Sequence, residues 1–420
     1  MDPHNSGQAR RNVCVVGLGY TGLPTAAVLA SRGYDVRGVE VNPRAVETIN
    51  SGRAHIVEPE LDMLVRAAVT TGKLRAWAEP AEADVFILCV PTPCQDRQPD
   101  LGFVVAATES ICPHVRPGNL VILESTSPPG TTERIADILR KETGLSADQV
   151  RVAHAPERVL PGHIVREVVE NERLVGGVDE ASTRAAAEFY RTFVSGAIHE
   201  TDARTAETVK LVENAFRDVN IAFANELSLL AEELELDVWE LIDLANRHPR
   251  VDILQPGPGV GGHCIAVDPW FLVATAPEVT KLIHMARTVN ESKPEWVVQR
   301  VLRRAERFRN PRIACLGLAY KPDVDDLRES PAVEVVRGIR DAAVGEVRVV
   351  EPYVDSHPEF ELSTCEEALE GADIVVVLVA HDPFRRLPRK LLEEKIVIDT
   401  CGLLRQRPWG RAEHARTAAA

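Results

Sequence analysis

A cysteine at the end of a glycine-rich stretch is the first residue whose surroundings suggest chemistry. In 257-GPGVGGHCIAVDPWF-271, four of the six residues from 257 to 262 are glycine, and Cys264 closes the run. Glycines let a backbone approach another group closely because they carry no side chain. A cysteine that only fills a core needs no such surroundings. The stretch therefore predicts that Cys264 lies where the backbone meets a ligand, four residues before Asp268.

Three polar residues upstream share a spacing. Lys210, Asn214 and Arg217 stand at i, i+4 and i+7 in a segment whose apolar residues recur at helical spacing, so they share one helix face. A solvated face would look the same, but more cations stand before the glycine stretch and in the segment 320–330; they are His248, Arg250, Lys321 and Arg328. A local excess of cations in an acidic chain is what an anionic ligand such as a diphosphate requires.

The elements that position a ligand begin at the N-terminal end. Residues 13–16 predict a strand, 17-GLGYTG-22 a tight turn, 23–33 a helix, and 35–41 a second strand with Glu40 near its end. A GxGxxG turn in this setting, followed by an acid, is typical of a dinucleotide-binding unit.

Each residue of that unit has a physical reason. Gly17 permits the turn, Gly19 lets the backbone meet a pyrophosphate, and Gly22 allows close packing of the helix, whose N-terminus faces the phosphates. Glu40 accepts hydrogen bonds from a ribose 2′-hydroxyl and repels a 2′-phosphate, which favours NAD over NADP. Arg44 stands close enough to leave NADP open, and a glycine-rich turn without a ligand is the alternative.

Further apolar runs at 84–90, 120–125 and 150–155 predict strands that alternate with helices. This alternation predicts a parallel, doubly wound sheet. The turns after these strands should lie along its carboxyl edge, where ligands bind. They are 91-PTPC-94, 126-TSPPGTT-132 and 156-PERVLPG-162.

One long helix is predicted over 204–234, a segment without glycine or proline. At about 1.5 Å per residue it is more than roughly 40 Å long, so we expect it to join two domains and to form a subunit interface. An internal scaffold helix would have the same pattern.

The last third of the chain repeats the first. The stretch 15-VVGLGY-20 aligns with 315-CLGLAY-320, and the later strands align as well, 35–41 with 346–352 and 84–93 with 373–384. Ala319 replaces Gly19 and Pro322 replaces Gly22, so we expect a second Rossmann-like domain for a different nucleotide or part of one. The alternative is two unrelated sheets of similar texture.

The predicted fold class is therefore α/β, with two Rossmann-like doubly wound domains joined by a long central helix. Its parts are a dinucleotide-binding domain over 1–202, a central helical region with the cysteine stretch over 203–305, and a second nucleotide domain over 306–420.

Composition limits the function classes. The 420 residues carry a net charge of −15, which disfavours nucleic acid and anionic membranes as partners. The eight cysteines form no CxxC pair, and no histidines stand at the spacing of zinc ligands. We therefore expect reduced thiols and no metal. Cys14, Cys89 and Cys315 are expected inside strands. The N-terminus lacks an apolar signal core and no apolar run approaches the roughly 20 residues of a membrane span, so we expect a cytoplasmic protein.

With these motifs in hand, the chain resembles the UDP-glucose/GDP-mannose dehydrogenase family over nearly its whole length. The histidine before Cys264 and the AVDPWF after it point to the N-acetylhexosamine branch of that family. The resemblance is carried by 17-GLGYTGLP-24, 91-PTP-93, 124-ESTSPPGTT-132, 156-PERVLPG-162, 210-KLVEN-214, 246-NRHPRVDILQPGPGVGGHCIAVDPWF-271 and 320-YKPDVDDLRES-330.

The resemblance implies that a sugar C6 alcohol is oxidised twice, to a carboxylate, with two NAD. Cys264 is then the nucleophile that forms a thiohemiacetal and a thioester. Lys210 and Asn214 stabilise the oxyanions, and Asp268 polarises Lys210 or the hydrolytic water. Glu157 activates that water, unless it is a carboxylate at a helix start.

The resemblance also implies the binding residues. His263 has a positioning role, and Arg328 contacts NAD unless it pairs with Asp325 or Glu329. The other NAD contacts are Tyr20, Thr21, Thr92 and Thr126. The UDP-sugar contacts are Arg158, Val159, Lys210, Asn214, Arg217, His248, Gly261, Tyr320, Lys321 and Arg250, the last reaching in from a partner subunit.

The expected activity is the oxidation of UDP-N-acetyl-D-mannosamine by a homodimer or higher oligomer formed through the central helix. Two departures from the branch are Glu40, where aspartate is commoner, and Ala155, where serine or cysteine is. Neither removes a reacting group. The alternatives are UDP-N-acetylglucosamine or UDP-glucose as substrate, a one-step hydroxyacid dehydrogenase, and a non-catalytic nucleotide-sugar sensor.

Overall fold

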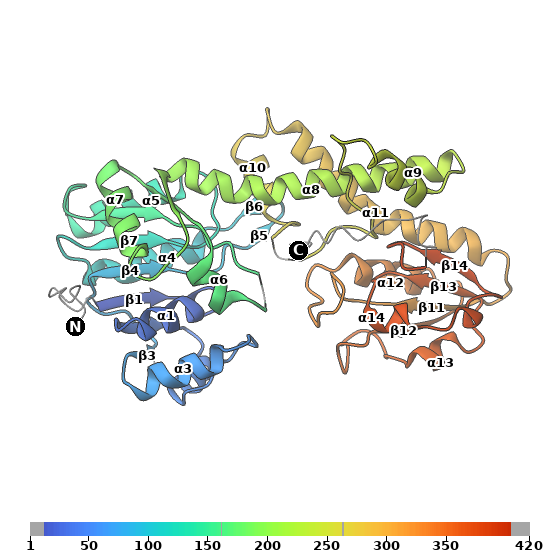
Figure 1. Cartoon of the computed structure of the whole chain (residues 1–420), viewed down its shortest axis with the longest axis horizontal. Coiled ribbons are helices and arrows are strands. Elements are labelled where there is room, and N and C mark those ends of the chain that lie inside the picture. Colours follow the sequence, from blue (N-terminus) through green and yellow to red (C-terminus); the bar gives the residue numbers. More distant parts are fainter. Residues whose placement is uncertain (1–11, 161, 263, 405–420) are drawn as a thin grey trace. The chain divides into compact units, whose positions relative to one another are not determined.

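The structure is a computed structural model that describes residues 12–160, 162–262 and 264–404 (Figure 1). Its described part forms two compact units. The first contains the residues up to Val212 together with Trp270–Thr275, and the second contains Glu213–Pro269 and the residues from Ala276 onward. The division into three parts at 202/203 and 305/306 stays a prediction.

Within the described residues, the first unit holds an eight-stranded sheet in the order β10-β9-β8-β7-β4-β1-β2-β3. The strands are β1 (Asn12–Val16), β2 (Asp35–Val39), β3 (Leu74–Trp77), β4 (Val85–Leu88), β7 (Leu120–Leu123), β8 (Arg151–His154), β9 (Arg173–Gly177) and β10 (Ile198–Asp202). A short hairpin, β5 (Cys94–Gln95) with β6 (Gln98–Pro99), lies outside this sheet.

The strands predicted at 13–16, 35–41, 84–90, 120–125 and 150–155 are confirmed as parallel neighbours, and the structure adds one antiparallel pairing that was not predicted. β9 pairs antiparallel with β8 through Ala153 with Gly177 and His154 with Gly176, while every other pairing of the sheet is parallel. The segment of β9, RLVGG, is short and ends in two glycines. Such a segment has neither an alternating nor a long apolar pattern, so sequence reasoning did not recognise it as a strand.

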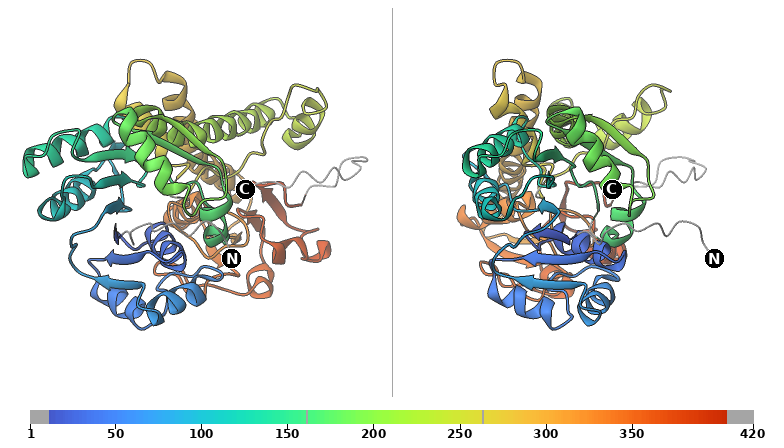
Figure 2. Two further views of the ribbon diagram at one scale, coloured as in Figure 1. Left: turned by 60° about the vertical axis from the view of Figure 1, so that its left-hand side comes forward. Right: turned by 90° about the vertical axis from the view of Figure 1, so that its left-hand side faces the viewer.

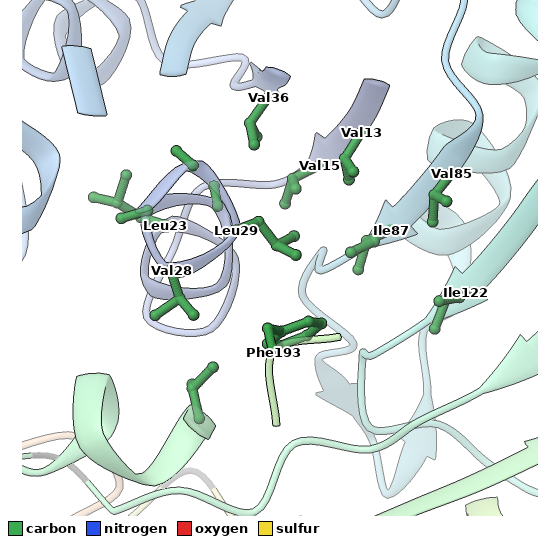
Figure 3. Close-up of a cluster of buried hydrophobic side chains, with 14 of the residues drawn as sticks. Val13, Val15, Leu23, Val28, Leu29, Val36, Val85, Ile87, Ile122 and Phe193 are labelled. Atoms are coloured by element: carbon green, nitrogen blue, oxygen red, sulfur yellow. The ribbon is translucent and has the colours of Figure 1, made fainter. Parts of the chain in front are cut away.

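Helices cover both faces of this sheet. The buried side chains of α1, α3, α6 and α7 form one core cluster with the strands, and those of α4 and α5 form another on the opposite face. Figure 3 shows Leu29 of α1 turned toward Val15 of β1 and Ile87 of β4. The helices are α1 (Gly22–Ser31), α2 (Pro43–Asn50), α3 (Leu61–Thr70), α4 (Gly102–Ile111), η1 (Cys112–His114), α5 (Thr131–Thr143), α6 (Ile164–Glu170) and α7 (Glu180–Tyr190).

The predicted long helix is confirmed as α8, which runs without interruption from Ala203 to Glu233 (Figure 1, Figure 2). It is followed by α9 (Val238–Ala245), α10 (Asp268–Thr275) and α11 (Lys281–Ala305). Pro294 lies inside α11 and cannot donate the usual bond to the carbonyl of Asn290.

The second unit repeats the Rossmann pattern, as predicted. Its four-stranded sheet has the order β12-β11-β13-β14, and all its pairings are parallel. The strands are β11 (Arg312–Leu316), β12 (Glu346–Val350), β13 (Ile374–Val377) and β14 (Ile396–Asp399), and the helices are α12 (Pro331–Asp341), α13 (Cys365–Leu369), α14 (Asp382–Arg385) and η2 (Arg389–Leu391). This order matches β2-β1-β4-β7 of the first sheet, so the alternative of two unrelated sheets is wrong.

All eight cysteines lie among the described residues, and there they are thiols rather than disulfides. Cys14 and Cys315 lie buried inside β1 and β11, where burial raises the pKa of both thiols, to about 11 and about 12. Cys89 was expected in a strand and instead follows the end of β4. There its thiol lies 3.2 Å from Oε2 of Glu124.

Candidate active site

The glycine turn after β1 has the geometry that a dinucleotide requires. Gly17 has a φ of +91°, and a Cβ there would lie 2.5 Å from the carbonyl oxygen of Cys89. A Cβ on Gly22 would lie 1.9 Å from the carbonyl oxygen of Gly17, but a Cβ on Gly19 would meet nothing within 4 Å. Two glycines therefore close the turn, and the third faces open space, where a pyrophosphate fits against the backbone.

The acid of the unit is held beside this turn. The backbone N–H of Leu18 donates to Oε2 of Glu40 at 3.2 Å, and the N–H of Asn42 donates to Oε1 at 2.9 Å. Asn42 caps α2, and Arg44 stands exposed in its first turn. A carboxylate fixed in this way still has free lone pairs for ribose hydroxyls.

The first turn of α1 completes the phosphate cradle. Tyr20 is 47% exposed, and Thr21 is the N-cap residue but makes no side-chain capping bond. The helix therefore begins with backbone N–H groups that no capping side chain occupies, which is the arrangement an anion uses. The residues present thus fit NAD.

Two predicted NAD contacts lie side by side at the carboxyl edge. Oγ1 of Thr92, after β4, donates to the carbonyl oxygen of Thr126, after β7, at 2.6 Å. Ser125 donates to the carbonyl of Val90 at 2.7 Å. These bonds tie the two turns to each other.

A buried carboxylate from α8 anchors the turn that follows Thr126. Oε2 of Glu207 accepts from the N–H of Gly130 at 2.6 Å, and Oε1 accepts from the N–H and hydroxyl of Thr132 at 2.7 and 2.6 Å. It thereby caps α5 from outside that helix. Glu207 stands one helical turn before the half-buried Lys210 on α8. Its carboxylate therefore connects the helix that carries Lys210 with the turn 126–132.

A buried histidine stands near Lys210. His154, at the end of β8, is 0% exposed. Burial, together with the positive charge of Lys210, lowers the pKa of His154 to about 3. The imidazole is therefore neutral, and sequence reasoning did not single it out.

Glu157 is not at a helix start; it lies in the loop between β8 and α6. Its Oε2 accepts from Arg173 at 2.7 Å in an ion pair whose side chains are 8% and 4% exposed. Its Oε1 accepts from the N–H of Arg158 at 2.8 Å. Arg158 also donates to the carbonyl of Glu172 at 2.7 Å, and Val159 packs against the core below the loop.

In the second unit, Cys264 is exposed, whereas the glycines at 261 and 262 are buried. The N–H of Asp268 donates to the carbonyl of Cys264 at 2.8 Å, so the cysteine and the first residue of α10 are one turn apart. Nδ2 of Asn214 donates to Oδ2 of Asp268 at 2.5 Å. The structure thus joins two predicted catalytic residues one turn from the thiol.

The glycines of this turn pack against the segment 320–331. A Cβ on Gly261 would lie 2.3 Å from the carbonyl oxygen of Glu329, and one on Gly262 would lie 2.8 Å from the ring of Tyr320. The N–H of Gly262 donates to the carbonyl of Arg328 at 3.3 Å. Only glycine fits at these two positions. The glycine stretch was predicted to approach a ligand, and in the structure it approaches the backbone of Glu329 and the ring of Tyr320.

The remaining predicted residues are placed as follows. Lys321 is half-buried next to Tyr320, and Arg328 is exposed and pairs with Asp326 at 2.6 Å. Arg217, His248 and Arg250 are exposed, and the N–H of Arg250 donates to Nδ1 of His248 at 3.3 Å. His263 lies outside the described residues.

Each unit holds its own part of the predicted site. The NAD residues other than Arg328, together with Glu157, Arg158, Val159 and Lys210, belong to the first unit. Asn214, Cys264, Asp268 and the remaining substrate residues belong to the second.

Comparison with known proteins identifies the chain's relatives. Three domain models of the UDP-glucose/GDP-mannose dehydrogenase family match it: the NAD binding domain over residues 11–194, the central domain over 204–292 and the UDP binding domain over 314–406. These matches cover most of the chain.

Full-length relatives are similar throughout. An NDP-N-acetyl-D-galactosaminuronic acid dehydrogenase of Ralstonia nicotianae is 56% identical over 407 residues, 94% of this chain and 96% of its own. A UDP-N-acetyl-D-mannosamine dehydrogenase of Yersinia pestis is 50% identical over 416 residues, 94% and 99% of the two chains. The solved structure of a UDP-D-ManNAc dehydrogenase from Pyrococcus horikoshii has a TM-score of 0.86 at 44% identity and covers 95% and 97% of the two chains.

Fold, glycine turn and relatives together define an NAD-dependent nucleotide-sugar dehydrogenase with NAD as its cofactor. The chain belongs to the UDP-glucose/GDP-mannose dehydrogenase family. In the part of the chain that the structure describes, no helix has the length and apolar character to cross a membrane.

Proposed function

We propose that the protein oxidises the C6 alcohol of a UDP-N-acetylhexosamine to the carboxylate, with UDP-N-acetyl-D-mannosamine as its substrate. The observation that carries the proposal is the exposed Cys264 one turn before Asp268, whose carboxylate Asn214 binds. A dehydrogenase that stops at the aldehyde has no use for a nucleophile there. The relatives of Yersinia pestis and Pyrococcus horikoshii support the choice of sugar.

The thiol divides the reaction into steps that balance. NAD, when bound, accepts the hydride of each of the two oxidations. The Cys264 thiolate adds to the carbon of the first product, an aldehyde, so a C–S bond forms and the carbonyl oxygen becomes the alkoxide of a thiohemiacetal. Oxidation of this adduct leaves a thioester on Cys264. Water then attacks the thioester carbon, the C–S bond breaks, and the carboxylate and the thiol are released.

The polar residues stabilise the charges that develop in these steps. Lys210 and Asn214, one turn apart on α8, stabilise the oxyanions at C6, because a cation and an amide N–H both lower the energy of a developing alkoxide. Asp268 orients Asn214 through the bond between them and polarises Lys210 or the water. Glu157, anchored by Arg173, remains the candidate that activates the water.

In this proposal, basic side chains and the backbone of the glycine stretch bind the UDP-sugar. Basic side chains pair with the diphosphate, while Gly261 and Tyr320 contact the sugar or nucleotide. The basic residues and their neighbour are Arg158, Val159, Arg217, His248, Arg250 and Lys321. NAD is bound by the glycine turn together with Glu40, Arg44, Thr92, Thr126 and Arg328.

We also propose that two copies associate through α8, which lets Arg250 reach the partner's site. Phe216, Phe223 and Leu230 recur every seven residues on this helix and are 69%, 51% and 48% exposed. An apolar stripe of this spacing is what a helix presents to another helix. Phe216→Glu should convert the dimer to a monomer in light scattering after gel filtration, and Phe103→Glu, a change at a 52% exposed phenylalanine of α4, should not.

The test of the reaction is the number of NADH formed per sugar consumed. The purified protein is offered UDP-N-acetylmannosamine, UDP-N-acetylgalactosamine, UDP-N-acetylglucosamine and UDP-glucose in separate assays. Two NADH with the first sugar alone support the proposal. Two NADH with another sugar keep the chemistry and overturn the substrate. The 56% identical relative named for a galactosaminuronic acid makes the galactosamine epimer the second candidate.

The cysteine is tested with the same assay. Cys264→Ala should abolish the formation of two NADH and of the thioester, which mass spectrometry of the quenched wild-type enzyme should detect on the peptide that contains Cys264. One NADH per sugar with the wild-type enzyme would indicate a one-step dehydrogenase. No NADH with any sugar, but tight binding, would indicate a nucleotide-sugar sensor.

A further inference from the structure

The two Rossmann folds differ at one pair of equivalent positions. The parallel registers align β4 with β13, and this alignment continues to place Thr92 of the first fold opposite His381 of the second. The acids after the second strands, Glu40 and Glu351, correspond as well. Thr92 binds a neighbouring turn, but His381 binds the acid itself.

In the second fold this pair is bonded to the turn that corresponds to residues 17–22 of the first. Oε2 of Glu351 accepts from the N–H groups of Leu318 and Ala319 at 2.7 and 2.9 Å, and Nε2 of His381 lies 3.1 Å from the same oxygen. The side chains of Glu351 and His381 are both 0% exposed. The turn of the second fold is therefore fixed by a buried acid that a buried histidine contacts.

The other ring nitrogen of His381 holds a second segment. The N–H of Asp323 donates to Nδ1 at 2.9 Å, so Nδ1 is an acceptor and the N–H of the ring is on Nε2, facing Glu351. Asp323 has a φ of +60°, an uncommon conformation for a residue with a side chain. It stands in a loop that the bond from Tyr320 N–H to the carbonyl of Asp326 closes at 3.1 Å.

The segment that contains this loop contacts the glycine turn at 261–262, which precedes Cys264. The ring of Tyr320 contacts Gly262, and Gly261 lies against the backbone of Glu329. Burial, with smaller contributions from Asp326 and from Cys264, raises the pKa of Tyr320. The contacts thus run from His381 through Asp323 and Tyr320 to the turn before Cys264.

We propose that His381 is a positioning residue for Cys264. The second fold has exchanged the threonine of a dinucleotide site for a histidine that is bonded to the buried acid on one side and to the loop 320–326 on the other. The loop, fixed at Asp323, seats the glycine turn and the thiol. The term nucleophile for Cys264 rests on the proposed function, but the seating of its turn does not.

Two substitutions separate the two bonds of the imidazole. His381→Asn keeps an acceptor near the Nδ1 position and loses the donor to Glu351. His381→Gln keeps a donor near the Nε2 position and loses the acceptor for the Asp323 N–H. Hydrogen–deuterium exchange, followed by mass spectrometry, is measured on the peptides that cover 257–268 and 320–331. We expect about tenfold faster exchange there in His381→Gln and near wild-type exchange in His381→Asn.

Thr400→Val is the matched control, because it removes a different buried hydrogen bond of the same unit, from the Thr400 hydroxyl to the carbonyl of Val377 at 2.8 Å. It should lower the unfolding temperature without changing exchange in the two peptides. Equal exchange in His381→Gln and wild type, equal acceleration in both histidine variants, or equal acceleration in Thr400→Val would overturn the proposal. The measurement needs no substrate, so it is independent of whether the proposed reaction is correct. In the active enzyme, His381→Gln should lower kcat more than it raises the KM for NAD.

Discussion

Gly19→Ala should weaken NAD binding without destabilising the fold. Gly19 has a φ outside the left-handed region, and an added Cβ would have no neighbour within 4 Å, so alanine costs the folded state almost nothing. The methyl group projects into the space where the pyrophosphate meets the backbone. Losing one charge-assisted N–H···phosphate bond of about 1.5–3 kcal/mol raises the Kd for NAD roughly 10- to 150-fold.

Gly22→Ala is the matched variant, because the same methyl group there meets backbone. Its Cβ would lie 1.9 Å from the carbonyl oxygen of Gly17, well inside van der Waals contact, so the turn or the helix must move. Forced overpacking of this kind costs about 1–3 kcal/mol. Calorimetric titration with NAD and thermal unfolding are measured on both variants. NAD affinity of Gly19→Ala equal to wild type, or a loss of stability as large as that of Gly22→Ala, would refute the reasoning.

Three further changes have expected outcomes. Glu207→Gln should lower the free energy of unfolding of the first unit by about 2 kcal/mol and should also lower kcat. The substitution places an amide donor against the first N–H groups of α5 and disturbs the helical turn that precedes Lys210. Glu133→Gln, at an exposed ion pair of α5, is the control and should change both quantities little in denaturant titrations and rate assays. His154 has a folded pKa of about 3 against an ordinary 6.5, chiefly because it is buried, so the stability it contributes is complete above pH 6.5 and declines as the pH falls toward 3. At pH 5 the wild type should have lost about 2 kcal/mol that His154→Leu does not lose, as urea unfolding at pH 7 and pH 5 will test. Burial lowers the pKa of Lys293 to about 7. The free energy of unfolding of the wild type should therefore rise by about 2–3 kcal/mol between pH 7.5 and 9.5. The same rise in a Lys293→Met variant would contradict this cause.

Local patterns predicted much of this protein. The turn 17–22, the following helix and the acid stand next to one another in sequence, so their order alone predicts a dinucleotide unit, and the matched strand order of the two sheets confirms the repeat. The long helix was equally readable, because its period is local. The motif around Cys264 was distinctive enough to indicate the family.

What the tertiary structure decided depends on residues far apart in the chain. Glu207 caps a helix whose first N–H groups stand 75 and 77 positions earlier, and His381 binds a backbone N–H 58 positions away. The pairing of Glu157 with Arg173 and the antiparallel placement of β9 belong to the same class. A carboxylate or imidazole has no sequence pattern that names its distant partner, because its hydrogen bonds form only when folding brings separate elements together. The sequence by itself determined the class of enzyme, because its signals are local, and the packing of its elements determined which distant groups hold each predicted site residue.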